Sequence, residues 1–258
     1  MHRLAFRVRG LRGVSAGRIA SASRWLLAIL LLASLAASRA ALVRADGGWT
    51  AYNDCVWESP QPEANITKYT LTTGSMSGPL VNYATGTPTV VTATLTVSGK
   101  VNVDETRGKE AASGTDAFTT FNGRVSSVGI LPYGAQSSWY VDLTFTGLDA
   151  SKGYTFATTA NAGASAYAGR ITRFVLNGAE HATNASTPGV TVTDTYTVTF
   201  DTGDNTANGY VARWTGIRPG SDGSFSVRAR AHVTSGMNAY QAYAFSVFML
   251  QEEPTNRA

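Results

Sequence analysis

The chain has 258 residues, of which 43% are hydrophobic and 15% are charged. This apolar content is enough to bury a core, which excludes an intrinsically disordered chain. One cysteine and three histidines exclude a disulfide-stapled scaffold and a cysteine-rich zinc module. Residues 1–45 hold eight of the 21 basic residues and none of the 17 acidic ones. Residues 46–258 therefore carry a net negative charge, and we expect no nucleic-acid partner.

The first 45 residues have the organisation of an export signal. An arginine-rich segment extends to Arg24, and the apolar run that follows, residues 26–37, is shorter than the roughly 20 residues of a membrane-spanning helix. Small residues precede two candidate cleavage points, after Ala40 and after Ala45. We expect cleavage after Ala45, a secreted or extracytoplasmic location, and no membrane attachment once residues 1–45 are removed. The alternative is an uncleaved amino-terminal anchor.

The rest of the chain, residues 46–258, is a succession of segments in which apolar and polar residues alternate. Such alternation is typical of strands with one buried face. The segments are 89–97, 139–146, 154–156, 174–176, 190–200, 210–214 and 225–233. Residues 240–250 are apolar on both faces, which predicts a strand in the centre of a sheet. About ten strands with neither a regular repeat nor a dividing linker predict one all-β domain, a two-sheet antiparallel sandwich of jelly-roll type.

Three segments between the alternating runs have the composition of connections. Residues 147–153 and 216–223 are rich in glycine and aspartate, and we expect a turn at the first and a hairpin loop at the second. Residues 104–114 are charged and compatible with a helix, and they predict an excursion on the surface. At the start of the domain, Trp49 and Trp57 are expected to hold the terminus on the sandwich as half-buried aromatics; the alternative is an aromatic binding platform.

Cys55 is the single thiol of a chain that we expect to enter an oxidising compartment. We predict that it is buried as a small hydrophobic residue; pairing between two chains and a reactive thiol are the alternatives. N-glycosylation sequons begin at Asn65 and Asn184, and their use depends on the host cell.

The second half of the domain carries an order of motifs that resembles a known family. A Tyr-Val-x-Leu-x-Phe strand begins at Tyr140, Arg170 to Gly178 form a strand and turn that end in Phe-Val-Leu-Asn-Gly, and an Asp-Gly-x-Phe-x-Val strand begins at Asp222. A closing strand, residues 243–250, follows. Residues 137–250 are therefore similar to galactose-binding-like β-sandwiches, including malectin-like modules. The resemblance implies a secreted bacterial β-sandwich that presents a sugar-binding site on its loops.

One loop has the residues that a sugar site needs. Flat aromatic faces bind the apolar side of a pyranose, and amide or guanidinium groups bind its hydroxyls. In residues 161–173, Tyr167 is predicted to stack on the sugar, and Asn161, Arg170 and Arg173 to form hydrogen bonds with it. The alternative is that Arg170 ties the loop to backbone carbonyls. The predicted function is binding of a carbohydrate or a cell-surface polymer.

Two further groups are candidates for binding. Arg213, Arg228 and Arg230 point outward on consecutive segments and could form a cationic strip for an acidic glycan, or a solvated polar face. A second segment supplies the hard oxygen donors that calcium requires, although such segments also form ordinary turns. Its members are Asp201, Asp204, Asn205 and Asn208. Calcium, if bound there, would be structural, and no other cofactor is expected.

The sequence contains few residues or motifs that are typical of a catalytic site. His181 and His232, the two histidines after the export signal, lack metal-binding spacing, and the chain has no Gly-x-Ser-x-Gly motif. The carboxylates stand in no pattern that indicates an acid–base pair. We therefore expect a non-catalytic protein. The first alternative is a structural or adhesive surface protein, and the second is a glycan hydrolase.

Overall fold

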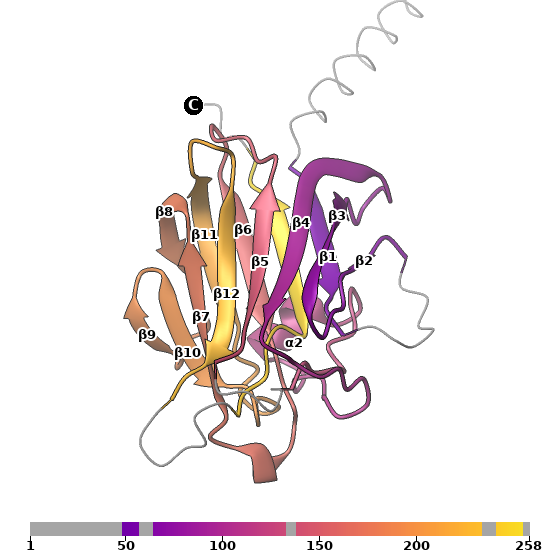
Figure 1. Cartoon of the computed structure of the whole chain (residues 1–258), viewed down its shortest axis with the longest axis vertical. Helices are drawn as coiled ribbons and strands as arrows, with labels where there is room; N and C mark the ends of the chain where they lie inside the picture. Colours follow the sequence, from indigo (N-terminus) through magenta and orange to yellow (C-terminus); the bar gives the residue numbers. More distant parts are fainter. Residues whose placement is uncertain (1–47, 57–63, 133–137, 234–240, 255–258) are drawn as a thin grey trace, which may run out of the picture. The chain divides into compact units, whose positions relative to one another are not determined.

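Two sheets packed face to face make up the computed structural model, which describes residues 48–56, 64–132, 138–233 and 241–254 (Figure 1). The six-stranded sheet has the order β2 (Thr67–Lys68), β1 (Thr50–Asp54), β13 (Val247–Glu252), β6 (Tyr154–Thr159), β11 (Ala212–Pro219) and β8 (Ala179–Asn184). The seven-stranded sheet has the order β3 (Gly74–Val81), β4 (Pro88–Ser98), β5 (Tyr140–Thr146), β12 (Phe225–Ala231), β7 (Ile171–Asn177), β10 (Thr197–Asp201) and β9 (Thr191–Asp194). Apart from the short parallel pair of β1 and β2, the strand pairs are antiparallel, so the predicted all-β, two-sheet sandwich is confirmed.

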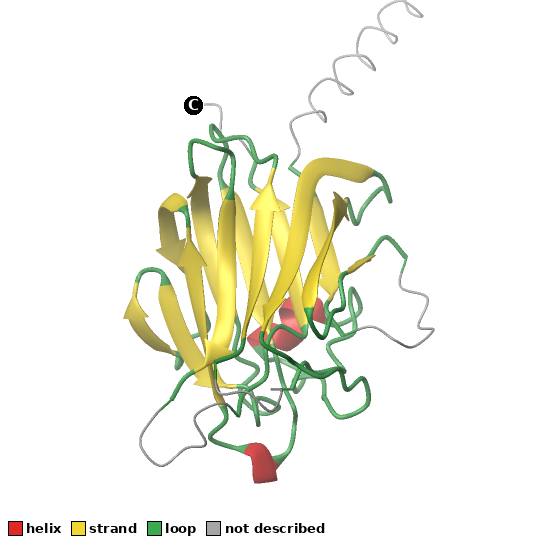
Figure 2. Cartoon of the chain, viewed as in Figure 1, coloured by secondary structure: helices red, strands yellow, loops and turns green. Residues whose placement is uncertain are grey.

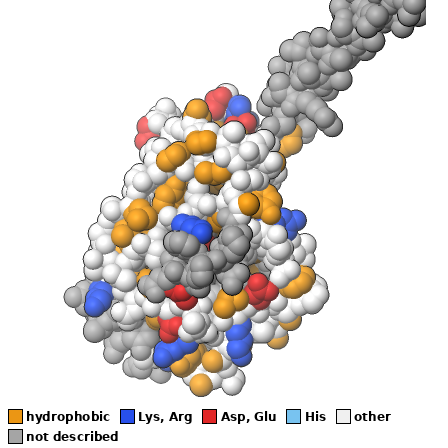
Figure 3. All heavy atoms as spheres, turned by 90° about the vertical axis from the view of Figure 1, so that its right-hand side faces the viewer, with side chains coloured by type: hydrophobic (Ala, Val, Ile, Leu, Met, Phe, Trp, Pro, Cys, Tyr) orange, Lys and Arg blue, Asp and Glu red, His pale blue; other side chains and the backbone are white. Residues whose placement is uncertain are grey.

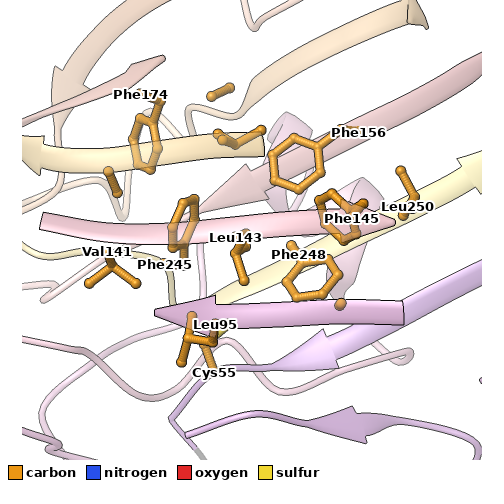
Figure 4. Close-up of a cluster of buried hydrophobic side chains, with 14 of the residues drawn as sticks. Cys55, Leu95, Val141, Leu143, Phe145, Phe156, Phe174, Phe245, Phe248 and Leu250 are labelled. Atoms are coloured by element: carbon orange, nitrogen blue, oxygen red, sulfur yellow. The ribbon is translucent and has the colours of Figure 1, made fainter. Parts of the chain in front are cut away.

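The predicted alternation separates the core from the solvent. On β4, Val91, Ala93 and Leu95 are buried, and the threonines between them are half-exposed. The same holds on β5, whose inner residue Phe145 lies 5.4 Å from the Phe248 ring of the opposite sheet, centroid to centroid (Figure 4). Apolar residues at every second position therefore meet between the two layers.

The six-stranded sheet is covered on its outer face as well. Helix α2 (Asp116–Phe121) begins after Thr115, whose hydroxyl accepts a hydrogen bond from the Phe118 N–H at 3.4 Å, a normal N-cap. Its Phe121 packs in a second, smaller apolar cluster that includes Val247 of β13. Because β13 lies between β1 and β6 under this helix, both faces of its first four residues are buried, as the continuous apolar sequence predicted. The strand begins only at Val247, however, and residues 241–246 of the predicted strand 240–250 are irregular.

The outer face of the seven-stranded sheet is the open side of the sandwich. In Figure 1 this sheet faces the viewer, and Figure 2 shows both helical segments near the lower end of the strands. Serine and threonine hydroxyls cross-link neighbouring strands here: Ser75 to Thr96 at 2.8 Å and Ser77 to Thr94 at 2.9 Å. This face is therefore a hydroxyl-lined surface, as Thr-rich outward positions indicate.

The segment 190–200 was predicted as one strand and is two. The chain reverses between β9 and β10, where the Asp194 carboxylate accepts the backbone N–H of Tyr196 at 2.8 Å. Val192 is consequently 51% exposed instead of buried. The alternation of apolar and polar residues continues across this reversal, so the sequence period does not reveal it. The reversal is marked instead by the short Asx turn at Asp194.

The predicted hairpin loop at 216–223 is also wrong. Strand β11 continues to Pro219 through a bulge near Gly216, whose φ of +57° a residue with a side chain rarely adopts. The tight turn comes later, where the Gly220 N–H donates to the Ser224 carbonyl at 2.9 Å. This turn does not form a hairpin, because β11 and β12 belong to different sheets.

Other predicted segments lie close to their expected places. Residues 104–114 are irregular, with mostly exposed or half-buried side chains, and contain no helix; α2 starts just beyond them. Trp49 is half-buried, and its indole N–H donates to the Glu252 carboxylate at 3.2 Å. Trp57 lies outside the described residues. Among those residues, no helix is long and apolar enough to span a bilayer.

Cys55 is fully buried, as predicted, and its sulfur accepts a hydrogen bond from the Asn53 amide at 3.3 Å. Burial, followed by the neighbouring Asp54 carboxylate, raises the pKa of this thiol well above its ordinary value. Because the thiolate is the reactive form, we expect no labelling of the native protein by Ellman's reagent at pH 8 and one equivalent in denaturant. Native labelling at the rate of a free thiol would contradict this burial.

Candidate functional site

Asn161, the first of the predicted ligand residues, is a structural residue in the fold. Its side chain is 3% exposed and donates to the Lys109 carbonyl at 2.8 Å and to the Thr206 hydroxyl at 3.0 Å. Its amide oxygen accepts the backbone N–H groups of Gly163 and Asn205 at 2.9 and 2.8 Å. These four bonds join three segments of the chain and leave Asn161 no exposed group for a ligand.

Tyr167 and Arg170 lie together at the end of the sandwich. Tyr167 closes the 3₁₀ turn η1 (Ser165–Tyr167), and the Arg170 guanidinium carbon lies 4.1 Å from the centre of its ring. The Arg170 Nη1 group also donates to the Tyr243 hydroxyl at 2.6 Å. Arg170 is thus clamped between two tyrosines, a favourable cation–π arrangement that orders this loop. Nothing in the sequence pattern pointed to Tyr243 as its partner.

The candidate calcium segment forms a hydrogen-bonded turn. The Asp201 carboxylate accepts the N–H groups of Gly169 at 2.5 Å and Gly203 at 2.8 Å. Asn205 is buried, and its amide bonds both the N–H and the carbonyl of Tyr210. Asp204 is half-buried and Asn208 is exposed. Within the described ranges, no three side chains of His, Cys, Asp or Glu gather as a metal site. Asp201 and Asn205 therefore act here as turn residues.

The predicted strip of Arg213, Arg228 and Arg230 does not exist. Arg213 lies on β11 and makes a two-point contact with Asp116 of α2, at 2.6 and 3.0 Å. Burial alone would raise the Asp116 pKa, but the hydrogen bonds from Arg213 and Thr187 lower it further than burial raises it. Arg213 is separated from the other two arginines because β11 and β12, though consecutive in the chain, lie in different sheets.

Two arginines stand side by side on the open face of the seven-stranded sheet. Arg230 of β12 pairs directly with Arg173 of β7, and Arg173 pairs on its other side with Thr199 of β10. Tyr140, the first residue of β5, follows the Val141–Ala229 pair and so lies beside Arg230 at this end of the ladder. The row Tyr140–Arg230–Arg173 therefore spans three neighbouring strands, about 5 Å apart.

The charges in this row are not neutralised by the protein. In the part of the chain that the structure describes, no Asp or Glu oxygen lies within 4.0 Å of Arg173 or Arg230. The Arg173 Nη2 group lies 2.8 Å from Nδ1 of His232, and its Nε is buried without a hydrogen-bond partner. Like charges on facing residues of a sheet are destabilising, and an unmet buried donor costs about 1–3 kcal/mol. An anionic ligand beside the pair would offset the repulsion between the two cations.

His232 is a neutral acceptor in this cluster. Its pKa lies below the ordinary value because of burial and then because of the positive charges of Arg173 and Arg230. A neutral ring can accept the Arg173 N–H at Nδ1, which explains their short separation.

The Tyr140 ring is held in place by its neighbours. The Arg228 guanidinium carbon lies 3.8 Å from the ring centre, and Arg228 forms two hydrogen bonds of 2.7 Å with Asp142. Arg228 is therefore neutralised and serves to orient the aromatic ring. The row Tyr140–Arg230–Arg173 thus combines an aromatic ring held in place with two cations that no described carboxylate neutralises. We call these three residues the basic row.

No family model, curated protein or solved structure matches the chain. Of the four residues predicted to bind a ligand, Tyr167 and Arg170 lie together, Asn161 is buried, and Arg173 is in the basic row. Sequence reasoning missed Tyr140 and His232 as members of a site. Their outward positions were visible in the alternation, but the neighbouring strand on each side was not.

Proposed function

We propose that the protein is an exported, non-catalytic module that binds a polysaccharide on the outer face of its seven-stranded sheet. The observation that supports this most directly is the basic row, in which Arg228 packs on the Tyr140 ring and Arg230 and Arg173 lie on the next two strands. An aromatic face and bidentate donors are the groups that a sugar ring requires.

The surroundings of the basic row suit a polymer. Cross-linked hydroxyl pairs, Ser75–Thr96 and Ser77–Thr94, extend the polar surface across β3 and β4. The sheet is open on this side (Figure 1), so a chain of sugars can lie across several strands. On the side of the molecule shown in Figure 3, the visible charged side chains of the described residues have both signs and are scattered among hydrophobic and uncharged ones.

The proposal includes three expectations from the sequence. Residues 1–45 direct export and are removed, the strands follow a jelly-roll course, and the module is a relative of the galactose-binding-like sandwiches. Its contact residues differ from those first predicted: Arg173 stays, Tyr140 and Arg230 join it, and Asn161 supports the fold. The Tyr167–Arg170 clamp orders the loop that precedes β7.

A structural or adhesive surface protein is the second candidate. It is favoured by the position of Tyr140, which is half-exposed on a sheet face. Such a protein would self-associate or stay in a matrix without saturable binding to a sugar. Equilibrium binding measurements therefore separate the two candidates.

Replacing Tyr140 with alanine tests the proposed function. We expect the mature domain to bind at least one member of a panel of neutral and acidic polysaccharides saturably. Tyr140→Ala should weaken that binding about five- to tenfold, since aromatic stacking contributes ~1–1.5 kcal/mol. Tyr83→Ala is the matched control, because Tyr83 packs edge-on against Tyr52 on the six-stranded side.

Calorimetric titration measures the polysaccharide affinity of each variant, and a thermal melt shows that each variant is folded. Equal affinity of the Tyr140 variant and the parent would rule out this face as the site. Absence of saturable binding to every polysaccharide, together with concentration-dependent self-association, would favour the adhesive protein.

A further inference from the structure

We propose that the polysaccharide is acidic, and that a carboxylate or sulfate group on it binds between Arg173 and Arg230. This inference rests on the proposed function, because it names the chemical class of the polymer. A carboxylate and a sulfate share the chemistry that the site recognises, namely a compact anion with several acceptor oxygens.

The first support is the contrast between these two arginines and others in the fold. Arg107, Arg213 and Arg228 each have a carboxylate oxygen within 3.1 Å. Arg173 and Arg230 have none within 4.0 Å among the described residues, although they face each other on adjacent strands. These three arginines are neutralised by carboxylates of the fold, whereas Arg173 and Arg230 form an adjacent pair that we assign to an external anion.

The second support is the availability of guanidinium N–H groups on the two arginines. The Arg173 Nη2 group is engaged with His232, and its Nε is enclosed by the protein, so an anion on the sheet surface approaches Arg173 through the outer end of its guanidinium. The Arg230 side chain is exposed, so its guanidinium N–H groups are accessible to a ligand. Facing residues of adjacent strands are about 5 Å apart, a span that one oxyanion can bridge with a bond to each guanidinium.

The third support concerns the density of charge on the ligand. Residues 46–258 contain 13 basic and 17 acidic side chains, so the domain as a whole repels a dense polyanion. A single cationic pair in a hydroxyl-lined surface matches a polymer that carries isolated anionic groups among many hydroxyls. An acidic polysaccharide has that composition.

Affinity for two matched pairs of polymers tests the inference. The pairs are polygalacturonate with its methyl ester and lightly substituted dextran sulfate with dextran, so that each pair differs in charge alone. We expect the charged member of one pair to bind at least ten times more tightly, which identifies carboxylate or sulfate as the source. Arg230→Gln should bring the two members within about twofold of each other. Arg218→Gln, an exposed arginine on β11 of the opposite sheet, removes the same charge and should leave the preference intact.

A second measurement observes the site without a polymer. A bound anion stabilises protonated His232, so we expect inorganic sulfate, at constant ionic strength, to raise the His232 pKa by roughly 0.5 units or more. The Arg230→Gln variant should lose most of this rise. The His232 ring resonances in an NMR titration report it directly, and Arg173→Gln, once shown to be folded, should behave in the same way.

The outcomes separate the two proposals. Binding of both members of each pair with equal affinity, reduced by Tyr140→Ala, would overturn the inference and leave the proposed function standing. Absence of binding to all four polymers, with a sulfate-induced rise of the His232 pKa, would indicate an adventitious ion only and overturn the inference, while the wider polysaccharide panel still decides the proposed function. A charge preference that survives Arg230→Gln would place the anion elsewhere and overturn the inference.

Discussion

Replacing Phe248 with alanine should lower the free energy of unfolding by about 3–5 kcal/mol, the range measured when large aromatic residues are removed from protein cores. Phe248 is fully buried on the central strand β13. Its ring centroid lies 5.4 Å from that of Phe145 in the opposite sheet and 6.0 Å from that of Phe156 on β6 (Figure 4). The substitution therefore opens a cavity at the contact between the layers, where neither sheet can collapse without moving the other.

Urea denaturation followed by tryptophan fluorescence measures this loss, because Trp214 is fully buried in the same core. Val192→Ala is the control. Val192 is 51% exposed on the edge strand β9, and its removal should change the free energy of unfolding by less than about 0.5 kcal/mol. A loss below about 1 kcal/mol for Phe248→Ala would show that the two sheets do not share this core.

Replacing Asn161 with alanine should cost about 3 kcal/mol of stability while leaving the polysaccharide affinity of the folded fraction unchanged. The substitution removes four hydrogen bonds and leaves the N–H groups of Gly163 and Asn205 without their acceptor. Buried donors that lose a partner account for a loss of this size. Asn161→Asp should be less harmful, since it keeps the acceptor oxygen and loses the two donated bonds.

The same denaturation experiment, paired with binding at a temperature where the variant is folded, checks both parts. Asn208→Ala, at an exposed position of the neighbouring turn, should be close to neutral. A stable Asn161→Ala variant that has lost binding would contradict the structural role and restore Asn161 as a ligand residue.

The predicted ligand loop shows how far local sequence reasoning extends. Tyr167 and Arg170 are three residues apart, and the sequence placed them in one loop with the right small neighbours. Tyr243, which completes their clamp, is 73 residues from Arg170 and sits in a segment that the sequence marked only as apolar. A hydrogen bond across that separation depends on how the two sheets meet at the end of the sandwich, and no local pattern encodes it.

The sequence by itself determined that the domain is a two-layered β-sandwich and which side of most strands meets water, because side chains alternate between the faces of a strand with a period of two. It also determined that β13 is a central strand and that Cys55 is buried. Only the tertiary structure decided which strands are neighbours. It separated Arg213 from Arg228 across the two sheets, and it set Arg230 beside Arg173 on the open face. Alternation assigns each residue to a face but contains no information on strand order, which arises from contacts between residues far apart in the chain.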